Sequence, residues 1–168
     1  LAILDKSGTP AEQQRRLEGL AEKNKDQFKS VASRARVSVG QAMIEAEQFK
    51  DAKDRFQALV EEGAGDRDTL ASAYSGLGDC SFNLGLRDQD VKKAQALFEE
   101  AVLHYLRVAA AYPEAFRLVP RALCHAGMGM NRLSKREDAT IVAGKLRRDY
   151  PNSEWTAKLF QELHISLR

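Results

Sequence analysis

Apolar residues recur along the chain at intervals of three and four, the period of an amphipathic α-helix. Alternation of apolar and polar residues over more than four positions is hard to find, and β-branched residues are sparse. The pattern therefore predicts an all-α protein. The breaks between the apolar stripes place eight helices at residues 10–24, 26–46, 50–62, 67–84, 88–111, 115–133, 136–149 and 154–167.

Local signals mark several of the predicted boundaries. Residues 9–12 (Thr-Pro-Ala-Glu) form a capping box with proline at the first helical position. Tyr112-Pro113 and Tyr150-Pro151 end the helices before them, because proline cannot continue a helix and restricts the preceding residue. Asn152 or Ser153 can cap the last helix. Because short turns join the helices, neighbours are expected to pack as antiparallel hairpins.

Glycines inside helices are the next feature. Gly40, Gly78 and Gly127 each lie in the middle of the first helix of a pair. A glycine there costs about 1 kcal/mol relative to alanine. Because this cost recurs at three matching places, we expect close packing of another helix against each glycine to compensate for it. The second helices carry small residues at matching positions, namely Ala52, Ala101 and Ala139.

The spacing of these small residues reveals an internal repeat and an insertion. The first and second glycines are 38 residues apart and the second and third are 49 apart, and the alanines show the same two distances in reverse order. The difference of 11 residues predicts an insertion between Gly85 and Ala101. Eleven residues make about three helical turns, so the insertion should lengthen the fifth helix without rotating its apolar face. Gly85 is expected to stop the fourth helix.

These recurrences resemble the tetratricopeptide repeat. The likeness rests on the small residues of both helices, on an aromatic residue at Phe56 and Tyr105, and on a closing proline at Pro113 and Pro151. The third repeat departs from the pattern, since Ala143 replaces the aromatic residue.

The resemblance implies a right-handed superhelix, or α-solenoid, of antiparallel helical hairpins. It implies a single domain made of an N-terminal flanking helix, three repeats and a C-terminal capping helix, at residues 1–30, 31–65, 66–113, 114–151 and 152–168. The first repeat has Ala64 where the closing proline would fall, and the second carries the insertion.

The segments 135–151 and 152–158 are similar to repeats of bacterial cell-envelope proteins. This likeness favours the periplasm or the envelope over the cytoplasm. The chain begins with Leu1 rather than methionine, so a signal peptide or anchor could have preceded it and the compartment stays open.

Charge and composition exclude some classes of function. The 26 Lys and Arg residues against 24 Asp and Glu give a net charge of +2, which argues against a dedicated nucleic-acid-binding protein. The basic excess of residues 114–168 has no accompanying aromatic stacking platform. No run of about 18 apolar residues exists, so no membrane span is expected in this chain.

Catalytic and metal-binding motifs are weak. Cys80 and Cys124 are too few for a disulfide scaffold and lack metal spacing, although one disulfide stays open. The three histidines form no metal-binding pair, and each is expected at the surface or in packing. Gly127 and Gly129 lie inside a helix, where a phosphate loop does not form. We therefore expect no cofactor, no metal and no enzyme; a Cys80 nucleophile with His125 as base is a remote alternative.

The resemblance implies a binding groove instead. In this family the first helix of each pair lines the concave face, and its polar and apolar mixture here suits a peptide or protein segment. Val37 and Gln41 stand where the carboxylate clamp of chaperone-binding members has Lys and Asn, so chaperone tails are not expected. The candidate groove residues are Arg34, Gln41, Glu45, Ser72, Ser75, Asp79, Phe82, Asn83, Arg121, Met128, Asn131 and Arg132.

Two other surfaces compete with the groove. The lengthened fifth helix is expected to project about 16 Å beyond its neighbours. The last helix carries more apolar residues than one face needs, which favours a structural subunit that self-associates through that helix as the main alternative. These residues are Trp155, Leu159, Phe160, Leu163, Ile165 and Leu167.

Overall fold

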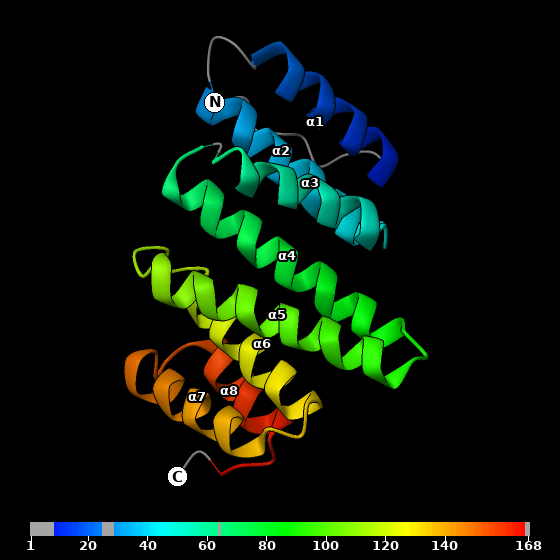
Figure 1. Cartoon of the computed structure of the whole chain (residues 1–168). Helices are drawn as coiled ribbons and strands as arrows, with labels where there is room; N and C mark the ends of the chain where they lie inside the picture. The colour runs from blue at the N-terminus through cyan, green and yellow to red at the C-terminus, as the bar shows by residue number, and fades with distance from the viewer. Residues whose placement is uncertain (1–8, 25–28, 64, 167–168) are drawn as a thin grey trace. The chain divides into compact units, whose positions relative to one another are not determined.

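The computed structural model describes residues 9–24, 29–63 and 65–166. Within these ranges the chain forms helices and no strand, which confirms the predicted all-α class (Figure 1). Its contacts divide it into two compact units, unit 1 (Leu1–Gly76) and unit 2 (Leu77–Arg168), with the boundary inside α4. The helices are α1 (Pro10–Asn24), α2 (Lys29–Glu45), α3 (Phe49–Glu61), α4 (Arg67–Arg87), α5 (Val91–Ala111), α6 (Val119–Arg132), α7 (Arg136–Asp149) and α8 (Glu154–Glu162).

The predicted start and stop signals act at several helix ends. At the start of α1 the Thr9 backbone N–H donates to Glu12 Oε2 at 2.9 Å, and the Glu12 N–H lies 3.4 Å from Thr9 Oγ1. Ser153 caps α8 by accepting from the Trp155 N–H at 3.3 Å. Tyr112 and Tyr150 leave helical geometry with nearly the same dihedrals, φ −131° and −138°, and so end α5 and α7.

The turns after α2 and α6 share one backbone conformation. Glu47 and Ser134 both have φ of 61°, in the left-handed region. The residues that follow them, Gln48 and Lys135, each donate a backbone hydrogen bond of 2.9 Å to the carbonyl five residues earlier. This is the hydrogen bond of a Schellman cap, here formed without glycine. The chain therefore closes both turns in the same way at positions 87 residues apart.

The prediction that Gly85 stops the fourth helix is wrong. Gly85 occupies the position that matches Glu47 and Ser134, but α4 continues past it to Arg87. A Cβ at Gly85 would come within 3.0 Å of the Phe98 ring of α5, so this glycine serves the close approach of α4 to α5. The helix can continue here because the insertion supplies further residues for both helices.

The 11 residues of the predicted insertion divide between α4 and α5 when these helices are compared with α2 and α3. Measured from the ends of α2 and α3, they form residues 84–87 of α4 and residues 91–97 of α5. The expected projection of one helix by three turns is therefore wrong, and α5 gains about two turns, or roughly 10 Å. The periodicity alone could not place the turn, which Asp90 fixes by capping α5.

Two other predicted boundaries are also wrong. α6 begins at Val119 rather than at residue 115, because residues 112–118 close a turn through hydrogen bonds such as Leu118 N–H to the Ala115 carbonyl. α8 ends at Glu162, since His164 adopts φ of 53° and the Ile165 N–H bonds to the Phe160 carbonyl. Residue 167, the predicted end of the last helix, lies outside the described residues.

The core of unit 1 forms around the ring of Phe56 in α3, which is fully buried. A Cβ added to Gly40 of α2 or to Gly76 of α4 would lie 2.5 Å from this ring. The two glycines therefore let both helices contact the aromatic ring directly, as the sequence predicts for Gly40. The dispersion energy of this close packing offsets the helix propensity that each glycine loses.

The apolar residues of α8 pack mainly inside unit 2. Leu159, Phe160 and Leu163 are buried, and a Cβ at Gly127 of α6 would lie 2.7 Å from the Leu159 side chain. Gly127 of α6 is therefore covered by a residue of α8. In the described part of the chain, each helix is either too short or too polar to cross a bilayer.

The capping residue of α5 gives a first test. The Asp90 carboxylate accepts from the Lys92 N–H at 2.9 Å and from the Lys93 N–H at 3.3 Å. We expect Asp90→Ala to lower the free energy of unfolding by about 1 kcal/mol, measured by urea denaturation. Asp90→Ser keeps a capping oxygen, so its free energy of unfolding should stay within a few tenths of 1 kcal/mol of the wild-type value. Equal losses in both variants would contradict the capping role.

Candidate functional site

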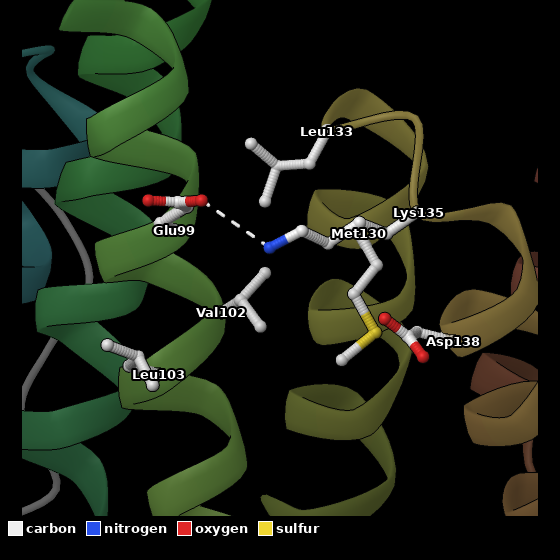
Figure 2. A pocket seen from close by; sticks show the side chains of 7 residues that line it. All are labelled: Glu99, Val102, Leu103, Met130, Leu133, Lys135 and Asp138. Carbon is white, nitrogen blue, oxygen red and sulfur yellow. Dashed lines mark hydrogen bonds and ion pairs between the residues drawn. The ribbon is translucent and has the colours of Figure 1, made fainter.

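Unit 2 contains a pocket between α5, the end of α6 and the start of α7 (Figure 2). Its volume is about 240 Å³, below the range of about 300–1,000 Å³ that is typical of small-molecule sites. An ion pair of 3.4 Å between Lys135 and Glu99 crosses it. Its size suits a single large side chain better than a cofactor. The lining residues are Glu99, Val102, Leu103, Met130, Leu133, Lys135 and Asp138.

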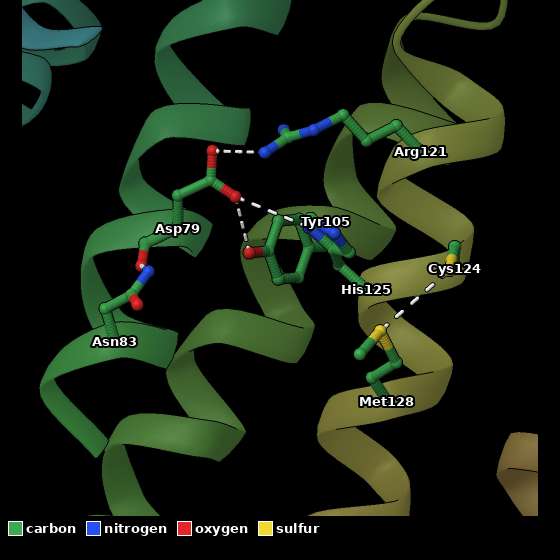
Figure 3. Close-up of polar contacts among 7 residues, drawn as sticks. All are labelled: Asp79, Asn83, Tyr105, Arg121, Cys124, His125 and Met128. Carbon is green, nitrogen blue, oxygen red and sulfur yellow. Dashed lines mark hydrogen bonds and ion pairs between the residues drawn. The ribbon is translucent and has the colours of Figure 1, made fainter. Parts of the chain in front are cut away.

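A second feature of unit 2 is a cluster of polar side chains around Asp79 of α4 (Figure 3). The Tyr105 hydroxyl of α5 donates to Asp79 Oδ1 at 2.7 Å, and Arg121 Nη2 of α6 donates to Oδ2 at 2.8 Å. His125 Nδ1, one turn further along α6, lies 3.5 Å from Oδ1. We call Asp79, Tyr105, Arg121 and His125 the Asp79 cluster.

The Asp79 carboxylate is ionised although its side chain is only 15% exposed. Burial raises its pKa, but the contact with His125 and the charge and hydrogen bond of Arg121 lower it further, so the net pKa lies below the usual value. Burial and the neighbouring carboxylate raise the pKa of Tyr105 well above its ordinary value. The tyrosine hydroxyl therefore stays protonated and acts as a donor, and the cluster is a fixed charge-assisted network.

The residue before Asp79 explains how the cluster assembles. A Cβ at Gly78 would lie 2.6 Å from the Tyr105 ring. Because Gly78 has none, the ring packs directly against α4, and its hydroxyl reaches the carboxylate on the next residue. The glycine that the sequence assigns to close helix approach therefore also positions the Asp79–Tyr105 hydrogen bond.

Aromatic and cationic side chains continue the cluster onto α8. The His125 ring makes edge contacts with Tyr105 at 5.3 Å and with Trp155 at 5.5 Å between centroids. Lys158 Nζ lies 5.0 Å from the centre of the Trp155 ring, and Arg121 Cζ lies 5.9 Å from it. Both cations are thus within the distance of a cation–π contact. Trp155 and Arg121 are partly exposed and Lys158 is exposed, so this end of the cluster faces solvent.

The two cysteines are buried and free. Cys124 Sγ lies 3.9 Å from Met128 Sδ, and burial raises the pKa of this thiol to about 11. A nucleophilic cysteine requires the opposite change, a lowered pKa and access to solvent. Cys80 is fully buried, and His125 directs Nδ1 toward Asp79. These environments are those of packing thiols.

The predicted groove residues of unit 2 are distributed as follows. The structure brings the Asp79 and Arg121 side chains together in an ion pair of 2.8 Å. Asn83 donates to the Asp79 backbone carbonyl within α4, at 2.8 Å. Phe82 packs edge-on against Phe98 at 5.4 Å between centroids. Met128 and Asn131 are partly exposed, and Arg132 is exposed with Nη2 3.9 Å from Glu162.

Two of the predicted groove residues of unit 1, Arg34 and Ser72, have local partners. Arg34 forms an ion pair with Asp66 across the turn that precedes α4. Ser72 donates to the Asp68 carbonyl at 2.8 Å within α4, whereas Ser75 is buried. Gln41 and Glu45 of α2 are exposed.

Sequence reasoning did not link Tyr105, His125, Trp155 and Lys158 to the site. The sequence gives Tyr105 as an aromatic residue of the repeat pattern, and it predicts His125 at the surface, in packing or, remotely, as a base for Cys80. One signal in the sequence points to part of the site. Asp79 directly follows Gly78, and a charged residue next to a glycine that packs against another helix must lie near that helix contact. The link from α6 to α8 left no signal, because it depends on tertiary packing.

Among the described residues, no three or more His, Cys, Asp or Glu side chains form a group that could hold a metal ion. Comparison with known proteins identified no relative: no family model matches the chain, and neither the curated proteins nor the solved structures contain a significant match.

Proposed function

We propose that the chain is a non-catalytic scaffold of the tetratricopeptide type, which binds a peptide or protein segment on the first helices of its hairpins. In this proposal α2–α3, α4–α5 and α6–α7 are consecutive hairpins of a right-handed superhelix, and α1 and α8 flank them. Three local observations support it: the shared turns at Glu47 and Ser134, the glycines that pack against rings, and an insertion that preserves the helical register.

The observation that carries the binding proposal is the solvent-facing end of the Asp79 cluster. Arg121 and Lys158 lie over the Trp155 ring, while buried hydrogen bonds hold Arg121 and His125 in place. Trp and Arg are the residue types most enriched at binding hot spots. Since the buried bonds already fix these side chains, binding costs less conformational entropy.

The chemistry of this surface selects an acidic segment. A carboxylate of the ligand can bind the Lys158 ammonium, while an adjacent apolar side chain packs on Trp155. Self-association through α8 has less support, because Leu159, Phe160 and Leu163 are buried within unit 2. Catalysis has less support as well, because both thiols are buried.

Trp155 provides the experiment, since it is the only tryptophan of the chain. Short acidic peptides selected on the chain from a displayed random library should change its emission on titration. We expect Lys158→Glu to weaken this binding at least tenfold, because it places a negative charge beside the indole.

A matched charge reversal at a distant lysine controls for the effect of the net charge of the chain on peptide binding. Lys92 is exposed near the start of α5, and Lys92→Glu puts an acid in a first turn, where it is tolerated. This variant should bind within twofold of wild type. Equal losses in both variants, or selected peptides that bind without changing Trp155 emission, would place binding elsewhere.

A further inference from the structure

Phe116 is the most exposed large apolar residue of the described chain, at 74%. It lies in the turn between α5 and α6, beside the exposed Arg117. The turn is ordered by backbone hydrogen bonds, including Phe116 N–H to the Glu114 carbonyl at 2.9 Å and Leu118 N–H to the Ala115 carbonyl at 2.8 Å. An aromatic ring next to a cation is thus presented on a fixed turn.

The pocket of Figure 2 has the complementary features. Val102, Leu103, Met130 and Leu133 supply its apolar lining, and Leu103 remains 67% exposed. Lys135 and Glu99 neutralise one another. The Asp138 carboxylate makes neither a hydrogen bond nor an ion pair with any residue in the described ranges. The pocket therefore presents an apolar surface and one uncompensated negative charge.

Size and charge match between the two surfaces. A cavity of about 150 Å³ is enough to hold benzene, so a pocket of about 240 Å³ has room for a phenylalanine ring. Arg117 adjoins Phe116 in the sequence. Its positive charge can pair with the Asp138 carboxylate. Phe116 and the apolar pocket residue Leu103 are both largely exposed.

A single molecule cannot join these two surfaces. α5 runs from the pocket at Glu99 to the turn that holds Phe116, and α6 returns from that turn to the pocket at Met130 (Figure 1). The turn thus lies at the start of α6 and the pocket at its end, while on α5 more than two turns separate Leu103 from the turn. The ring of one molecule can reach only the pocket of another, and a contact between two different surfaces is heterologous and leaves one of each free.

We propose that Phe116 of one copy of this chain inserts into the pocket of a second copy, where Arg117 pairs with Asp138. The contact is head-to-tail, so repeated contacts build open chains of molecules. It uses neither Trp155 nor Lys158, and it is therefore independent of the proposed peptide site.

Complementary variants test this contact. Phe116→Ala removes the ring and keeps the pocket, whereas Leu103→Lys blocks the pocket, neutralises Asp138 and keeps the ring. Both residues are exposed, so circular dichroism should be unchanged. In sedimentation velocity, the average mass of the wild type should rise with concentration, and each variant alone should remain monomeric.

Mixing the two variants gives the decisive result. An equimolar mixture should form a 1:1 dimer and nothing larger, because only one ring and one pocket remain. Ile141→Ala, which alters an exposed residue of α7 outside the pocket lining, should behave as the wild type. A wild type that stays monomeric at all concentrations, a mixture that stays monomeric, or single variants that still dimerise would overturn the proposal.

Discussion

Replacing Asp79 by alanine is expected to lower the free energy of unfolding of unit 2 by about 3–5 kcal/mol, the cost of removing one partner of a buried charged pair. The variant removes the carboxylate that accepts from the Tyr105 hydroxyl and from Arg121 Nη2. A buried donor without an acceptor loses its hydration and gains nothing in return. The loss should therefore far exceed that of an ordinary surface carboxylate.

Urea denaturation followed by Trp155 emission measures this effect, because Trp155 contacts the cluster through His125. Glu137→Ala is the matched control: Glu137 is exposed in the first turn of α7, and its loss should cost less than about 1 kcal/mol. A cost for Asp79→Ala as small as that for Glu137→Ala would show that the cluster does not stabilise unit 2.

The pH dependence of stability gives an independent readout of the same carboxylate. The pKa of Asp79 is lower in the folded chain than the ordinary value of about 3.9. Its contribution is thus fully present at neutral pH and is lost as the pH falls below about 4 toward the folded pKa. The difference in stability between wild type and Asp79→Ala should shrink in that acidic window.

The sequence predicts the helices well because their signals are local. Proline after Tyr112 and Tyr150, and the caps at Thr9 and Ser153, act within one turn of the chain. The wrong boundaries have non-local or unusual causes. Gly85 remains helical because Phe98 packs against it.

Left-handed caps without glycine are the second cause of error. Glu47, Ser134 and His164 all adopt positive φ, although non-glycine residues seldom do. No residue-type signal distinguishes His164 from its helical neighbours, so the early end of α8 could not be predicted. The hydrogen bonds of the cap stabilise this conformation instead.

The candidate site was predictable only in part. The resemblance to the tetratricopeptide repeat implies that Asp79 and Arg121 line one face, and the structure joins them at 2.8 Å. The roles of Tyr105 and His125 depend on which atoms meet between helices, and periodicity fixes a face of a helix but no atom on it.

The same substitution at two glycines of unit 2 is expected to have opposite effects. Gly78→Ala should destabilise the chain by about 1–3 kcal/mol, because its Cβ would lie 2.6 Å from the Tyr105 ring. The ring is buried and its hydroxyl is bonded to Asp79, so it cannot move away without losing that bond. Gly144→Ala meets no atom within 4 Å and should stabilise α7 by up to about 1 kcal/mol.

A double-mutant cycle shows whether the Tyr105 ring causes this difference. In a Tyr105→Ala background the space beside residue 78 is open. Gly78→Ala should then no longer lower the free energy of unfolding, and it should raise it through helix propensity, as expected for Gly144→Ala. Thermal or urea unfolding of the four chains measures the coupling. If Gly78→Ala costs the same with and without the ring, contact with Tyr105 is not the reason for glycine at this position. A coupling of 1 kcal/mol or more would instead tie the glycine at position 78 to the packing that holds the Asp79 cluster together.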